Sequence, residues 1–160
     1  MHTDLWNYAL ALYAQPGVEA ACLRLQDEGG DVCLLLCGAW LQARQVTASE
    51  PRVAALLALA GPWQRDVIAP LRQLRQQWRK QAEDDPQLAA LRARVKGLEL
   101  EAERGLLGRL EQQAAEWPGE RKRCSEDWLA RLMPGAAMAE DALQHLRVSA
   151  QALQDGEDVD

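Results

Sequence analysis

The sequence predicts an all-α protein, and its composition is the main reason. Alanine and leucine occupy 53 of the 160 positions, whereas valine, isoleucine and threonine together occupy 11 and phenylalanine is absent. Alanine and leucine lose little freedom in a helix, while β-branched and aromatic residues favour strands. The length fits one domain. We therefore expect a single all-α domain, a helical bundle over residues 1–153, followed by an acidic and disordered tail over 154–160.

Capping and breaking residues divide the beginning of the chain into three expected helices. The first covers about 4–14, with Thr3 or Asp4 as a cap, and ends at Pro16-Gly17. The second covers about 18–27 and ends at Gly29-Gly30. Asp31 then caps a third helix, whose run from Val32 to Leu41 is apolar on every side. A helix of that kind is normally enclosed by other helices, so we place the centre of the core here.

The middle of the chain predicts a long antiparallel hairpin. A helix beginning at Ser49-Glu50-Pro51 is expected to be interrupted at Gly61-Pro62, and another covers about 63–81, in which Pro70 produces a kink or marks a new start. After a short turn, Asp85 caps the longest helix, about 86–116, and a short connection makes neighbouring helices antiparallel. Its apolar stripe has a helical spacing and consists of Leu88, Leu91, Val95, Leu98, Ala102, Leu106 and Leu110. Beyond it, we expect a short helix capped by Ser125 and a last helix over 138–153.

The charge and the start of the sequence indicate the compartment. The net charge of −6 and the pI of about 5.0 argue against non-specific nucleic-acid binding, which requires an excess of basic residues. The first lysine or arginine is Arg24, and the longest uncharged run, 5–18, is too short and polar for a membrane span. We therefore expect a cytoplasmic protein without membrane contact, whose four cysteines are thiols.

Three segments carry a resemblance to a known family. The stretch from Trp6 to Leu41, which begins WNYALALYAQPG, resembles the opening of a family of short, uncharacterised proteobacterial proteins with a domain of unknown function. The segments PWQRDVIAPLRQLRQQWR (62–79) and ELEAER (99–104) resemble the second half of that family. The resemblance covers roughly 5–115, and it implies an all-α fold and a cytoplasmic location but no activity. Cys33 departs from the asparagine that members often carry, which weakens any role for that position.

Two groups of side chains suggest metal chemistry, and each has a structural alternative. Cys33 and Cys37 lie one helical turn apart, and Cys22 on the preceding helix could join them in a zinc site. Buried cysteine more often behaves as a small apolar core residue, and we favour that interpretation. Asp27 and Asp31 form a D-x-x-x-D pattern like that of magnesium–diphosphate sites, but the two glycines between them favour a capping role for Asp31.

The acidic segment of the longest helix also has two interpretations. Glu99, Glu101 and Glu103 could supply paired carboxylates to a metal enzyme, although the sequence has no E-x-x-H motif. We favour ion pairs between these acids and arginines of the facing helix, with Arg72, Arg75 and Arg65 as candidates.

The leading functional hypothesis is a non-enzymatic adaptor or regulator that binds another protein. Arginines recur every seven residues along the first hairpin helix, and residues 64–80 carry a net charge of +4. Tryptophans are enriched in binding hot spots, and two of the six lie beside prolines. The proposed partner-binding residues are Arg72, Arg75, Arg79, Trp63 and Trp117.

Other functions are open at this point. The first alternative is a helical bundle that binds a small ligand or lipid in a cavity, and a less favoured one is a magnesium-dependent carboxylate enzyme. A homo-oligomer is also possible. The leading hypothesis includes no catalytic residue, metal or cofactor, since no known catalytic or phosphate-binding motif occurs.

Overall fold

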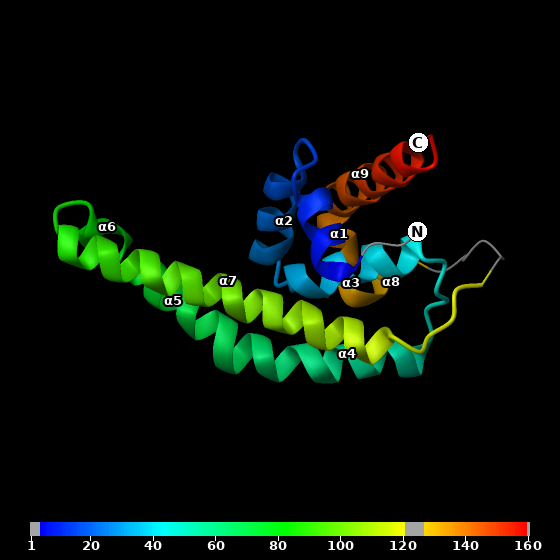
Figure 1. Cartoon of the computed structure of the whole chain (residues 1–160), viewed down its shortest axis with the longest axis horizontal. Coiled ribbons are helices and arrows are strands. Elements are labelled where there is room, and N and C mark those ends of the chain that lie inside the picture. Colours follow the sequence, from blue (N-terminus) through cyan, green and yellow to red (C-terminus); the bar gives the residue numbers. More distant parts are fainter. Residues whose placement is uncertain (1–3, 121–126, 160) are drawn as a thin grey trace.

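The structure is a computed structural model that describes residues 4–120 and 127–159, and helices dominate it (Figure 1). Among these residues, extended pairing is limited to an isolated bridge between Val46 and Gly119. The prediction of an all-α fold is confirmed. In chain order the elements are α1 (Leu5–Tyr13), α2 (Val18–Asp27), α3 (Val32–Ala43), α4 (Glu50–Trp63), η1 (Gln64–Ile68), α5 (Ala69–Gln77), α6 (Arg79–Ala82), α7 (Pro86–Ala114), α8 (Trp128–Leu132), η2 (Ala136–Ala139) and α9 (Glu140–Glu157).

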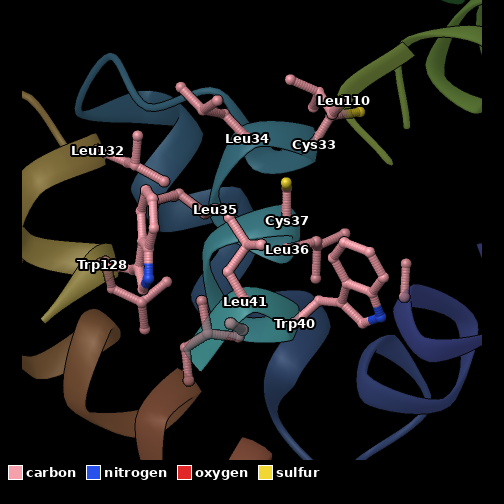
Figure 2. Close-up of a cluster of buried hydrophobic side chains, with 14 of the residues drawn as sticks. Cys33, Leu34, Leu35, Leu36, Cys37, Trp40, Leu41, Leu110, Trp128 and Leu132 are labelled. Carbon is pink, nitrogen blue, oxygen red and sulfur yellow. The ribbon is translucent and has the colours of Figure 1, made fainter. Parts of the chain in front are cut away.

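Helix α3 is the centre of the core, as its apolar sequence predicts. Every residue from Cys33 to Leu41 is buried, and α1, α7, α8 and α9 pack against this helix. Figure 2 shows Leu110 of α7 on one side of α3 and Trp128 of α8 on another. Because neighbours cover it from several directions, a polar residue on almost any face would be buried without water.

The turn between α1 and α2 lies against α9. Gly17 has a φ of +78°, and a Cβ atom on it would lie 2.6 Å from Nε2 of His145. The same ring nitrogen lies 3.0 Å from the carbonyl oxygen of Pro16, to which it can donate a hydrogen bond. A residue with a side chain at position 17 would therefore be strained and would displace the histidine.

The predicted hairpin is present, but its first arm is longer and more continuous than the sequence indicates. Helix α4 continues through Gly61-Pro62 to Trp63, and the π-helix η1 joins it to α5. The N–H of Ala69 reaches back five residues to the carbonyl of Gln64, instead of four. Pro70 lacks an N–H, and the wider π turn accommodates it without breaking the helix.

The distal end of the hairpin projects beyond the other helices (Figure 1). Neither α5 nor α6 contains a buried residue, and Val95 is the first buried residue of α7. Two leucines of the predicted apolar stripe, Leu91 and Leu98, are 44% and 51% exposed. The stripe prediction is therefore wrong at these positions, because α5 and α6, which pack along this part of α7, leave these two side chains open to solvent.

The end of the chain completes the core around α3. Asp127 caps α8, and the fully buried indole of Trp128 donates a hydrogen bond of 2.7 Å from Nε1 to the carbonyl oxygen of Val46. Helix α9 packs against α2 and α3 and continues to Glu157, so residues 154–157 of the expected disordered tail are helical. The predicted cap Ser125 lies outside the described residues. Within the part of the chain that the structure describes, no helix has the length and hydropathy needed to cross a membrane.

Candidate functional site

Two arginines of the predicted partner surface belong to an ion cluster between α5 and α7. Arg72 donates from Nε to Oε1 of Glu99 at 3.0 Å and from Nη2 to Oε1 of Glu103 at 3.2 Å. Arg75 donates from Nε to Oε2 of Glu99 at 2.6 Å. The interpretation of these side chains as partners across the hairpin is confirmed. These bonds connect the two arms of the hairpin where apolar burial is scarce.

The remaining arginines of the stripe lie outside this cluster. Arg65 pairs with its neighbour Asp66 and not with α7, so the alternative that included Arg65 in the cross-hairpin pairs is wrong. The Arg65 side chain is 71% exposed, and such a pair contributes little to stability. Arg79 is exposed and forms no ion pair with any described residue.

The cluster gives its two glutamates different titration behaviour. Burial by itself would raise the pKa of Glu99, but hydrogen bonds and charge from Arg75 and Arg72 outweigh it and lower the pKa. Burial raises the pKa of Glu103, the charge of Glu99 adds to that effect, and Arg72 opposes it. Glu99 is therefore held as an ionised counter-ion, whereas Glu103 is less well neutralised.

Both tryptophans of the predicted partner surface are half-buried and make contacts inside the fold. Trp63 donates a hydrogen bond of 2.9 Å from Nε1 to the carbonyl oxygen of Ala102 on α7. Trp117 stacks on Trp128, with ring centroids 6.2 Å apart and planes inclined by 13°. Trp128 itself is fully buried and belongs to the core. These contacts join the hairpin to itself and to the C-terminal helices.

A pocket of about 200 Å³ lies between the N-terminal helices and the hairpin. Helix α1 contributes Trp6 and Leu10, and α2 contributes Leu23. The start of α3 and the two arms of the hairpin supply the other walls, which include Asp31, Cys33, Gln64, Arg72, Leu100 and Glu103. The pocket is mostly apolar, with a small number of converging polar groups, which is the usual composition of a binding site.

Large apolar side chains surround this pocket and remain open to solvent. Leu10, Leu23 and Leu100 are 50%, 51% and 52% exposed, and Tyr13 is 38% exposed. Single exposed leucines are common on protein surfaces, whereas groups of exposed apolar side chains are less common. We call these four residues the apolar rim.

Asp31 occupies the wall of the pocket and also caps α3. Its Oδ1 accepts the backbone N–H of Leu34 at 3.3 Å, which confirms the predicted capping role. Its Oδ2 is shielded from solvent and accepts no hydrogen bond. Burial raises the pKa of this carboxyl, and the backbone N–H groups and Arg72 oppose the shift. Asp27 is exposed and does not line the pocket.

The described cysteines are core residues, as the composition of their helices indicates. Cys22, Cys33 and Cys37 are buried free thiols, and burial raises the pKa of Cys22 to about 12. In residues 4–120 and 127–159, no three His, Cys, Asp or Glu side chains are grouped so that they could hold a metal ion. Cys124 lies outside the described residues.

Sequence reasoning did not predict which residues line the pocket, nor the burial of Glu99. No pattern of neighbouring residues in the sequence indicates the pocket, because its walls come from helices that are far apart in the chain. Glu99 does have a signal: it lies four residues after Val95 and three before Ala102, on the face of α7 that is buried. A glutamate on a buried helix face requires a positively charged partner, and the arginines of the facing helix are the candidates.

Comparison with known proteins places the chain in a family without giving it an activity. No curated protein and no solved structure matches it. Residues 4–110, more than half of the 160, match the family model described as Protein of unknown function (DUF2390). All the residues that line the pocket lie inside this matched stretch. The chain therefore belongs to the DUF2390 family of proteins of unknown function.

Proposed function

We propose that this protein is a non-enzymatic adaptor that binds another protein at the apolar rim, with one side chain of the partner entering the pocket. The observation that carries the proposal is the rim itself, three half-exposed leucines and a tyrosine on α1, α2 and α7 around one pocket. Apolar anchors that enter pockets supply much of the affinity of protein interfaces. Of the five residues that the sequence suggested for binding, Arg72 lies in the wall of this pocket.

The size of the pocket supports a protein partner. Sites for drug-sized ligands usually span about 300–1,000 Å³. A pocket of about 200 Å³ suits one side chain, and the rim outside it can contact the neighbouring residues of the same segment. Glu99 and Glu103 form ion pairs with arginines, and this supports a role of the site in binding rather than in catalysis.

The test is affinity capture from the native cell with a rim variant and a matched control. The rim variant is Leu23→Ser with Leu100→Ser, at positions that are 51% and 52% exposed. The control is Leu57→Ser with Leu91→Ser, at two leucines that are each 44% exposed and lie away from the pocket. Covering the open half of a leucine is worth about 1 kcal/mol, so the rim variant should lose about tenfold or more in affinity for a purified partner.

The proposal is supported by a protein that the wild type and the control retain and the rim variant loses. It is refuted when every retained protein also binds the rim variant. A second copy of this chain on the rim would give a dimer that the rim variant dissociates, and that result would refute an adaptor with a different partner at this surface.

A further inference from the structure

The wall of the pocket has more negative than positive charge. Asp31 and Glu103 line it together with Arg72, but the guanidinium of Arg72 is already bonded to Glu99 as well as to Glu103. Two further arginines lie nearby: Arg75 is bonded to Glu99, and Arg104 lies over the ring of Trp6 at 4.8 Å. Glu19 on α2 adds another negative charge, since it affects the pKa values of Tyr13 and Cys22. The titratable groups around the pocket therefore sum to a net negative charge, with the phenol and the thiols neutral.

Two carboxylates of this wall have hydrogen-bonding capacity left. Oδ2 of Asp31 is buried and accepts no hydrogen bond, which is costly for a carboxylate oxygen. The Glu103 side chain is 27% exposed and has one oxygen, Oε1, bonded to Arg72. A ligand that enters the pocket would thus meet carboxylate oxygens that have no hydrogen-bond donor, together with Arg72, two glutamines and the apolar surfaces of Trp6, Leu10 and Leu36.

We propose that the pocket binds a primary alkylammonium group, with its apolar stem against α1 and α3 and its N–H donors directed at the Asp31 and Glu103 carboxylates. An anion would be repelled by the same wall, and a neutral apolar group would leave its acceptors unpaired. The alkylammonium group can belong to a lysine side chain of a protein partner or to a free alkyl amine. As a statement about the partner, this inference rests on the proposed function, but the chemistry of the pocket can be tested without any partner.

The experiment measures binding of three ligands with the same carbon chain, hexylamine, hexanol and hexanoate, by calorimetry with the full chain. Hexylamine is expected to bind most tightly. Asp31→Asn and, separately, Glu103→Gln should each weaken hexylamine by about tenfold, the size expected for a lost charged hydrogen bond, and should leave hexanol unchanged. Asparagine is also a good helix cap, so Asp31→Asn retains the start of α3. The control is Asp27→Asn, which makes the same change of charge at an exposed acid outside the pocket.

A dependence on pH gives a second readout. Burial raises the pKa of both carboxyls, so affinity for hexylamine should fall as the pH is lowered through these raised values, whereas affinity for hexanol should not change. A capped lysine, acetylated and amidated, measured beside hexylamine identifies the source. Comparable binding of the two indicates a partner's lysine, and preference for hexylamine indicates a free amine.

The inference is overturned when hexylamine does not bind, when hexanol or hexanoate binds as tightly, or when both Asp31→Asn and Glu103→Gln leave hexylamine binding unchanged. These outcomes are independent of the test of the adaptor. Selective amine binding, with no partner lost by the rim variant, would refute the protein partner and support the amine pocket. Loss of a partner by the rim variant, without selective amine binding, would support the protein partner and refute the amine pocket.

Discussion

Replacing Glu99 by alanine should destabilise the protein more than any other single change to a charged residue of α7. The Glu99 side chain is 6% exposed, and it is the shared counter-ion of Arg72 and Arg75, whose side chains are 17% and 23% exposed. The change removes hydrogen bonds of 3.0 and 2.6 Å and leaves two guanidinium groups partly buried without this acid. Removing one member of a buried pair costs about 3–5 kcal/mol. Since Glu103 still binds Arg72, we expect a loss of about 2–4 kcal/mol in the free energy of unfolding.

The assay is chemical denaturation of the wild type, Glu99→Ala and Glu101→Ala. Glu101 is an exposed acid on the same helix, so its replacement should change stability by about 0.5 kcal/mol or less. The distal hairpin should respond most, because α5 and α6 have no buried residue of their own. Hydrogen exchange should therefore become faster over residues 69–98 than in α3. Equal stabilities of Glu99→Ala and Glu101→Ala would refute the claim that this cluster holds the two arms together.

Three further outcomes follow from single contacts. Trp128→Phe removes the indole donor to the carbonyl oxygen of Val46 and part of a fully buried ring, so thermal denaturation should show a loss of about 1–3 kcal/mol; an unchanged midpoint would contradict this. Asp85→Ala removes the cap that accepts the N–H groups of Gln87 and Leu88, and should cost about 1 kcal/mol in denaturant, against no measurable cost for Asp84→Ala. Folding lowers the pKa of Glu99 from 4.5, so its contribution to the free energy of unfolding is complete above that value and is lost as the pH falls through the folded pKa. The difference in stability between the wild type and Glu99→Gln should therefore shrink on acidification. A difference that stays constant with pH would contradict this.

The local sequence was sufficient to predict most of the helices. An aspartate before an apolar run caps α3 and α7 in the structure, because its side chain accepts N–H groups that have no partner in the first turn. The interruption expected at Gly61-Pro62 was wrong, because α4 continues through both residues to Trp63. The expectation at Pro70 was better, since the π-helix η1 ends just before it and α5 begins with Pro70 in its first turn, where a missing N–H costs little.

The sequence by itself determined the fold class and the enclosed position of α3, since composition, caps and an apolar surface on every side are properties of consecutive residues. Only the tertiary structure decided that Leu98 is exposed while Glu99 is buried, and that Asp31 faces a pocket beside Arg72 and Glu103. Helical spacing tells which residues share a face, but the burial of that face depends on which distant helix covers it. The pocket exists because α1, α2, α3 and the hairpin pack together at one place. No pattern among neighbouring residues of the sequence indicates that these elements are in contact.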